Sequence, residues 1–149
     1  MTKIEQTVNE IYCIIQKDER CRCEIDYVEQ LSWILFLKYV EDLENNWKTE
    51  VEQSGKEYSE IIREEFKWRS WAAPKDQNGN IDYNALTGDD LIDFVSDKLF
   101  PYMMELRSYA SGRSRLEYNI GEIFSGLKTM MQNGYKLREI LNKADTLSF

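Results

Sequence analysis

The sequence contains no histidine, and its seven glycines are scattered singly along the chain. Histidine is the side chain used most often as a general acid or base. Phosphate-binding loops need glycines clustered in a G-x-G-x-x-G or Walker pattern, and neither pattern occurs. We therefore expect no catalytic residue and no cofactor-binding residue in this chain. An independent small enzyme is the least favoured interpretation.

Cysteine is also scarce, with Cys13, Cys21 and Cys23 as the whole set. An odd number gathered near one end does not suit a disulfide framework. Zinc sites are mostly four-coordinate sets of cysteine and histidine, and no histidine is present to complete one. We expect no metal site, and reduced, partly buried thiols. The adjacent carboxylates Asp89 and Asp90 are better explained as charges at a helix start than as an acid–base pair.

Long apolar runs are absent too, since the longest is residues 33–37, WILFL. A membrane-spanning helix needs about 20 such residues, so we expect no membrane span. The first residues, MTKIEQ, are polar and charged and have no apolar signal-peptide core. The cytoplasm is the expected location.

The formal charge of −8 is unevenly distributed. Residues 1–98 carry 22 acids and 12 bases, a net charge of −10, and residues 99–149 carry 5 acids and 7 bases, a net charge of +2. Phosphate contacts supply most non-specific affinity for nucleic acid, so the acidic part is not expected to bind DNA alone. The basic part either faces a polyanion or is a solvated surface of mixed charge, and the second explanation is the simpler one.

Apolar residues recur at steps of three and four along most of the chain, which predicts helices. With 149 residues there is room for one domain. We predict an all-α fold, an irregular bundle of about five to seven helices over residues 1–149, with one ordered aromatic loop or small hairpin. The first helix is expected at about residues 2–17 and a second, the longest, from Asp26 to about Asn46. Lys38 interrupts the apolar centre of that second helix and is expected to snorkel or to pair with Asp42.

The middle of the chain is harder to interpret. A short helix is expected around residues 58–62, before Phe66. Residues 67–86 are expected to form an ordered loop pinned by Trp68 and Trp71, with a small hairpin about Asn78-Gly79. The two tryptophans are either a packed part of this loop or a platform on which bases stack, and packing is favoured.

The last third shows three further helical patterns. Thr87 is expected to cap a helix that Pro101 stops or kinks, and residues 102–109 are expected to restart it. Another helix is expected from Ile120 to Met131, ended by Asn133-Gly134 as a C-cap. A last helix includes Leu137, Ile140 and Leu141.

Three groups of short motifs occur in a fixed order. The first is the helix ILFLK at residues 34–38. The second is W-x-x-W at 68–71, LTGDDL at 86–91 and LFPY at 99–102. The third is IGEIF at 120–124, GYKLREI at 134–140 and DTLSF at 145–149. Together they resemble the N-terminal helical domain of the modification subunit, an adenine-specific DNA methyltransferase, of type I restriction–modification systems. The sequence departs from the family at residues 21–24, CRCE, where relatives have a glycine-containing turn.

The resemblance implies a parent enzyme that methylates adenine with S-adenosylmethionine. In the family, a methyltransferase domain with a glycine-rich cofactor loop and an N-P-P-(F/Y) motif follows the helical domain, and both motifs are absent here. We expect that domain downstream and treat this chain as a truncated piece rather than a natural stand-alone protein. The implied partners are the specificity subunit, a second modification subunit, the restriction subunit and double-stranded DNA.

Two functions remain open. In the first, the domain helps subunit assembly and clamps DNA, positioning it without reading bases. Candidate DNA contacts were chosen for their positive charge and their position in expected loops, from which side chains reach outward: Lys67, Arg69, Lys75, Arg113 and Arg115. In the second, the domain is a purely structural helical interaction or dimerisation domain without DNA contact, which the acidic residues 1–98 favour.

Overall fold

The structure is a computed structural model that describes residues 2–58, 60–82, 84–109, 115–128 and 131–149. Its elements are α1 (Lys3–Gln16), α2 (Glu24–Gln53), η1 (Glu64–Phe66), α3 (Trp68–Trp71), α4 (Gly88–Phe94), η2 (Val95–Leu99), α5 (Phe100–Glu105), η3 (Leu106–Tyr109), α6 (Arg115–Ser125) and α7 (Gly134–Ala144). The described residues contain no β-strand, so the predicted all-α class is confirmed.

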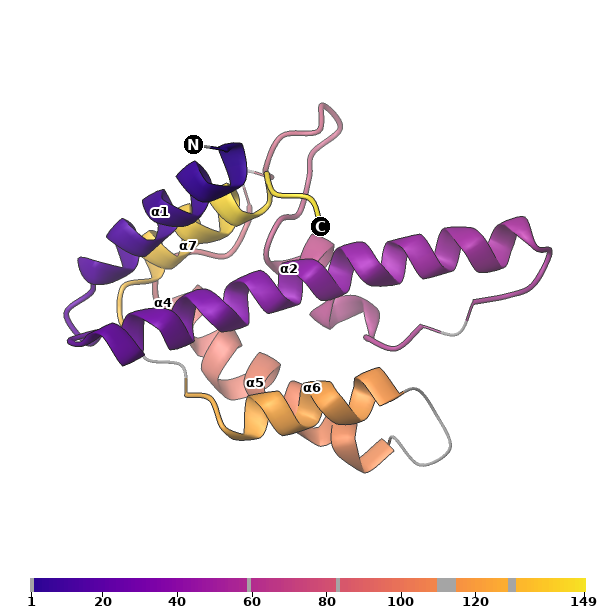
Figure 1. The fold of residues 1–149 in the computed structure, drawn as a ribbon. Coiled ribbons are helices and arrows are strands. Elements are labelled where there is room, and N and C mark those ends of the chain that lie inside the picture. Colours follow the sequence, from indigo (N-terminus) through magenta and orange to yellow (C-terminus); the bar gives the residue numbers. More distant parts are fainter. Residues whose placement is uncertain (1, 59, 83, 110–114, 129–130) are drawn as a thin grey trace.

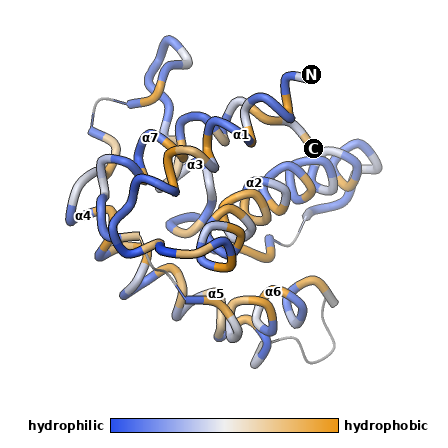
Figure 2. Tube along the Cα trace, turned by 60° about the vertical axis from the view of Figure 1, so that its left-hand side comes forward, coloured by the Kyte–Doolittle hydropathy of each residue, from blue (hydrophilic) through white to orange (hydrophobic). Residues whose placement is uncertain are grey.

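Helix α2 crosses the whole molecule, with α1 and α7 side by side along one flank and α5 and α6 along the other, while α4 packs against α7 (Figure 1). Hydrophobic residues mark the stretches of α2, α5 and α6 that come together (Figure 2). The core includes Trp33, Ile34, Leu99 and Phe124, all fully buried. Within the described part of the chain, none of the helices has both the length and the apolar character that crossing a bilayer requires.

The first helix agrees with its prediction. Thr2 and Glu5 form a reciprocal capping box, in which the Glu5 amide donates to the Thr2 hydroxyl at 3.1 Å and the Thr2 amide donates to the Glu5 carboxylate at 3.2 Å. This pairing satisfies two amides that a helix start leaves without partners. The buried face includes Ile11 and Ile15.

The predicted ends of the second helix were wrong. Helix α2 begins at Glu24, and the Asp26 carboxylate accepts a hydrogen bond from the Arg22 amide at 3.0 Å instead of capping the helix. It runs on to Gln53, well past the apolar pattern, because the polar residues that follow are compatible with helix and no breaker occurs before Gly55, where φ is +79°. The expected pairing of Lys38 with Asp42 is confirmed at 2.7 Å.

The short helix expected around residues 58–62 does not form among the described residues there. Glu44, a buried residue of α2, accepts hydrogen bonds from the Tyr58 hydroxyl at 3.2 Å and from the Ile61 amide at 2.5 Å. These bonds hold the segment against α2 and take an amide that a helix would have used. A short 3₁₀ turn, η1, follows instead.

The aromatic segment contains a single helical turn, α3, followed by a small hairpin. An isolated antiparallel bridge joins Lys75 to Ile81, and Gly79 takes a positive φ of 82° at the turn. The hairpin about Asn78-Gly79 is thereby confirmed. Pro101, by contrast, does not stop the chain's helical course, because the π turn η2 leads directly into α5. A proline has no amide to donate, and the wider turn changes the hydrogen-bond register where that amide is missing.

Asn133-Gly134 does not end a helix as predicted. Helix α6 ends at Ser125, and Asn133 is the N-cap of α7, where its side chain accepts hydrogen bonds from the amides of Tyr135 and Lys136, both at 3.0 Å. Asparagine suits both ends of a helix, so the dipeptide alone does not decide between them. The buried residues of α7, including Leu137, agree with the prediction.

Candidate nucleic-acid interface

Lys67 lies between η1 and α3 and is buried, with 5% of its surface exposed. Its ammonium nitrogen is 2.7 Å from a carboxylate oxygen of Glu60. The hydrogen bond from Lys67 holds the pKa of Glu60 below its usual value. The expectation that Lys67 reaches outward is therefore wrong, because this buried charge is paired inside the protein.

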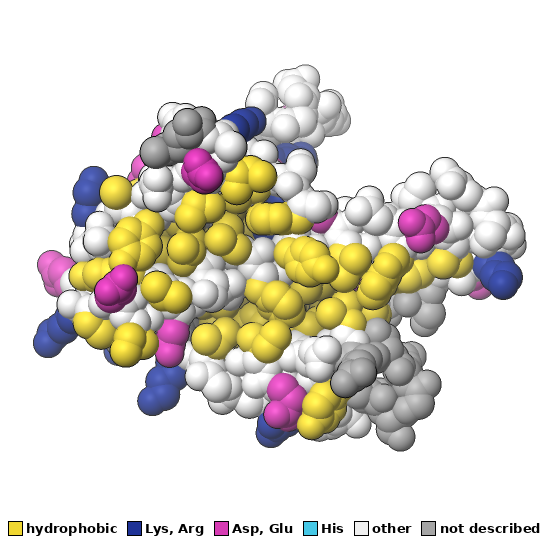
Figure 3. Space-filling view, viewed as in Figure 1, with side chains coloured by type: hydrophobic (Ala, Val, Ile, Leu, Met, Phe, Trp, Pro, Cys, Tyr) yellow, Lys and Arg dark blue, Asp and Glu magenta, His cyan; other side chains and the backbone are white. Residues whose placement is uncertain are grey.

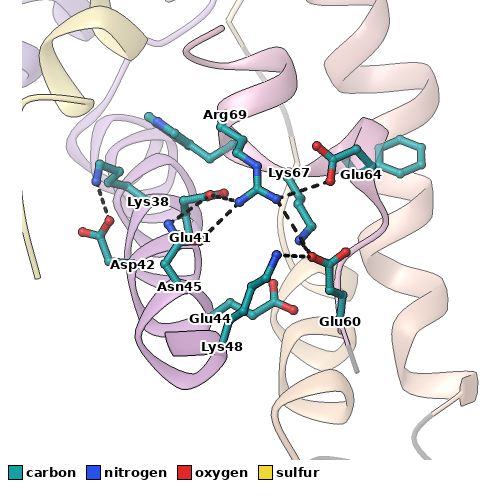
Figure 4. A network of polar contacts seen from close by, with 12 residues as sticks. Lys38, Glu41, Asp42, Glu44, Asn45, Lys48, Glu60, Glu64, Lys67 and Arg69 are labelled. Atoms are coloured by element: carbon teal, nitrogen blue, oxygen red, sulfur yellow. Dashed lines mark hydrogen bonds and ion pairs between the residues drawn. The ribbon is translucent and has the colours of Figure 1, made fainter. Parts of the chain in front are cut away.

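Arg69 lies on α3 and is exposed, with its guanidinium directed toward α2 (Figure 4). Its guanidinium is 3.4 Å from Glu41, 3.3 Å from Glu64 and 3.2 Å from the side-chain oxygen of Asn45. Lys48 of α2 joins the same network, 3.5 Å from Glu60. The carboxylates of Glu41 and Glu64 therefore already compensate much of the positive charge of Arg69 within the domain.

Lys75 forms an ion pair with Asp145, near the end of the chain. The same carboxylate accepts a hydrogen bond from the indole nitrogen of Trp68 at 3.0 Å. The three residues join the aromatic segment to the C-terminal segment. Of the remaining candidates, Arg113 lies outside the described residues, and only the backbone of Arg115, at the start of α6, is described.

The two tryptophans are packed, as favoured from the sequence. Trp68 and Trp71 are 4% and 3% exposed, and their rings meet edge to face with centroids 5.9 Å apart. The Trp71 indole nitrogen donates to the backbone oxygen of Phe66 at 3.2 Å. A stacking platform for bases needs open ring faces, and these rings have none.

Arg138, from the GYKLREI motif, binds two other motif segments together. Its guanidinium donates to the backbone oxygens of Leu86, at 3.1 Å, and Ala72, and to the Asn142 side chain at 3.1 Å. Burial lowers the pKa of Arg138. The role of Arg138 in holding these segments was not foreseen, because it depends on residues more than fifty positions away.

Two motif glycines meet where α4 and α7 begin. A Cβ atom on Gly134 would lie 1.8 Å from the backbone oxygen of Gly88, so only glycine fits. A cavity of about 260 Å³ opens beside them, lined in part by the carboxylates of Glu19 and Asp89. Those carboxylates oppose the binding of a phosphate.

Asp18 ties the α1–α2 turn to the segment before α7, and sequence reasoning missed it. It is 2% exposed, and its carboxylate accepts hydrogen bonds from the amides of Gln132, at 3.0 Å, and Asn133, at 2.9 Å. The only signal was a polar break after the first helix. The turn brings several exposed basic residues to one end of the bundle, where none forms an ion pair with a described residue: Lys17, Arg20, Arg22 and Lys128.

The cysteines form no disulfide and, in the described ranges, no cluster of potential metal ligands is present. Cys21 is buried, whereas Cys13 and Cys23 are exposed. Burial, together with the carboxylates of Asp18 and Asp26, raises the pKa of Cys21 to about 11. The thiol is therefore protonated at neutral pH and weakly reactive.

A family model described as the HsdM N-terminal domain matches residues 4–144, almost the whole chain. The chain belongs to the HsdM N-terminal domain family. It is 32% identical over 146 residues to the type I restriction enzyme EcoEI methylase subunit of Escherichia coli, covering 98% of this chain and 27% of that protein. The resemblance stated from the motifs is thereby confirmed.

Two solved structures share the fold. One is the crystal structure of a modification subunit assigned to a type I restriction enzyme from Vibrio vulnificus YJ016, with a TM-score of 0.86, 28% identity, and coverage of 99% of this chain and 31% of that one. The other comes from work on complex assembly and conformational transition of the type I R-M system, with a TM-score of 0.72, 31% identity, and coverage of 97% and 26%. This HsdM N-terminal domain thus spans under a third of the relatives it matches.

Proposed function

We propose that this domain is an assembly module of a type I restriction–modification methylase subunit. The observation that carries the proposal is the match of nearly the whole chain to the N-terminal domain family and to a methylase subunit. The proposed partners are the specificity subunit, a second modification subunit and the restriction subunit. S-adenosylmethionine and adenine methylation are assigned to a methyltransferase domain downstream of this one, and the proposed location is the cytoplasm.

Assembly is favoured over DNA contact at the aromatic segment because the basic residues there are already paired. Lys67, Arg69 and Lys75 each lie within 4 Å of a carboxylate of this domain. A DNA phosphate would have to compete with those partners, whereas a protein surface would not.

The test is direct binding of the purified chain to the specificity subunit, followed by size-exclusion chromatography and interferometry. We expect a defined complex. Absence of a complex at concentrations up to about 100 µM, far above the usual range for stable assemblies, would contradict the assembly role.

DNA clamping is the second candidate, and the basic end of the bundle supports it. The exposed cations Arg20, Arg22 and Lys128 have no acidic partner among the described residues. Any DNA contact is expected to be with the phosphate backbone, because lysine and arginine side chains bind phosphates without reading the base sequence.

In the assembled complex, reversing the charge of Arg113 and Arg115 together should weaken DNA binding and flatten its dependence on salt. Reversing the charge of Lys98, an exposed residue on η2, is the matched control. Equal binding by all three proteins at low salt would remove the clamping role from these two arginines.

A further inference from the structure

One face of α2 carries apolar side chains that the rest of the chain leaves uncovered. Ile25, Val28 and Tyr39 are 70%, 47% and 42% exposed, and Leu35 and Leu43 on the same side of the helix are half-buried. We call these five residues the α2 stripe. Figure 3 shows hydrophobic side chains gathered along α2 on this face, with charged side chains mainly at the margins.

The spacing of the α2 stripe is that of a helix-packing seam. Its members follow one another at steps of three, seven, four and four, and Ser32 divides the step of seven into four and three. Residues at such steps lie above one another on one side of a helix. A straight seam of about five turns matches the side of a second helix better than a flat or irregular surface.

The charge of α2 favours a positively charged partner helix. Helix α2 contains eight acids and two bases. Both bases are already engaged, Lys38 with Asp42 and Lys48 with Glu60. The exposed carboxylates of Glu24 and Glu50, in contrast, form no ion pair with a described residue. Lysine and arginine on a partner helix would complement them, whereas DNA or a second copy of α2 would bring like charges together.

The C-terminal residue extends the same surface. The Phe149 amide donates to the Asp42 carboxylate at 3.1 Å, and the Phe149 ring meets that of Tyr39 edge to face, with centroids 6.3 Å apart. Phe149 is still 49% exposed, so the contact widens the apolar surface instead of covering it. Leu147, buried at 2%, anchors the segment that places it there.

We propose that the α2 stripe and Phe149 form the docking surface for one amphipathic helix whose apolar face is bordered by lysine and arginine. The source of that helix, another subunit of the type I assembly, rests on the proposed function. The chemistry of the partner rests only on the exposed stripe, its spacing and the unpaired carboxylates of Glu24 and Glu50 beyond its two ends.

The experiment measures binding of a designed four-heptad peptide, with leucine at the a and d positions and lysine at e and g, to the complete chain by fluorescence anisotropy. Lysine at e and g keeps the peptide from pairing with itself. A second peptide of the same composition has its leucines redistributed around the helix. We expect the first peptide to bind at least about tenfold more tightly than the second.

Two variants locate the site, each with a matched control. Val28→Gln and Tyr39→Gln remove apolar surface without adding charge, and each is expected to weaken binding of the first peptide at least about tenfold. Ile123→Gln and Tyr118→Gln change side chains of similar exposure, 42% and 50%, on α6 and should leave binding within about twofold. Circular dichroism confirms that the four variants keep their helices.

Three results would overturn the inference: equal binding of both peptides, binding insensitive to the two α2 variants, or a dimer of the chain that Tyr39→Gln dissociates. The last would make a second copy the occupant. Failure here is distinct from failure of the proposed function. If the chain joins the specificity subunit and Tyr39→Gln does not weaken that complex, the assembly role stands and the docking surface is wrong.

Discussion

The contact of Gly134 with Gly88 gives the sharpest prediction about stability. In Gly134→Ala the new Cβ atom would be placed 1.8 Å from the Gly88 oxygen and 2.6 Å from its Cα atom. Both of these atoms belong to the backbone, so a change of side-chain rotamer cannot relieve the clash. Overpacking a core costs about 1–3 kcal/mol when side chains absorb it. We therefore expect a loss of about 3 kcal/mol or more, since here α4 and α7 must separate.

Two other glycines provide graded controls. Gly88→Ala strains a residue with φ of +57°, and the nearest atoms to its Cβ would be those of the exposed Tyr135 ring at 3.3 Å, so about 1–2 kcal/mol is expected. Gly126→Ala meets nothing closer than the Ile123 oxygen at 3.8 Å, and should change stability by less than about 0.5 kcal/mol.

The assay is urea unfolding followed by circular dichroism, with thermal melts alongside. For a domain of this size, 3 kcal/mol corresponds to a fall in Tm of roughly 6–12 °C. The order of loss should be Gly134→Ala, then Gly88→Ala, then Gly126→Ala. A Gly134→Ala protein within about 0.5 kcal/mol of the wild type would refute the argument that these two backbones are in contact.

Three further predictions concern single polar groups. Arg138→Met leaves two backbone oxygens without donors and should cost about 1–3 kcal/mol in urea unfolding, and an unchanged midpoint would contradict its bridging role. Cys21 should react with iodoacetamide more slowly than the exposed Cys13 at pH 8, because the pKa of its thiol is raised to about 11, and equal rates by mass spectrometry would argue against this. The pKa of Glu60 is lowered in the folded state by Lys67, so its contribution to stability is present above the pKa of the unfolded carboxyl and is lost as the pH falls through the lower folded value. Glu60→Gln should therefore flatten the fall in unfolding free energy below about pH 4, and an unaltered pH profile would exclude the pair as its cause.

Local sequence patterns predicted the helices whose two faces differ. The first helix and α7 were placed well because their apolar residues recur at helical steps and their other faces are polar. The end of α2 was missed because its last turns contain neither an apolar stripe nor a breaker before Gly55. Where the apolar repeat ends but helix-forming residues continue, a prediction from periodicity alone places the end of the helix too early.

Contacts that local sequence rules do not predict account for the other errors. The prediction placed Asn133 at the C-terminal end of a helix, because asparagine is common at both helix ends. In the structure it caps the start of α7, where the next residue, Gly134, packs against the backbone of Gly88. Lys67 was expected to face solvent because its position was taken as a loop, yet Glu60 holds it inside. Neither contact can be predicted from the residues that are adjacent in the sequence.

The motifs that carry the family resemblance are the cross-links of the fold. Trp68 is joined to Asp145 through its indole nitrogen, Arg138 holds the segments on either side of the hairpin, and Gly134 faces Gly88. Because the motif residues hold the fold together, their presence identifies the fold and does not identify a ligand-binding site. Binding is therefore expected at the surfaces that the motifs leave open, which are the basic end of the bundle and the α2 stripe. The two surfaces meet at the start of α2, where Arg22 is three residues from Ile25. A variant at Tyr39, much further along α2, should therefore leave binding at the basic end unchanged, because residues far apart with no shared partner act independently.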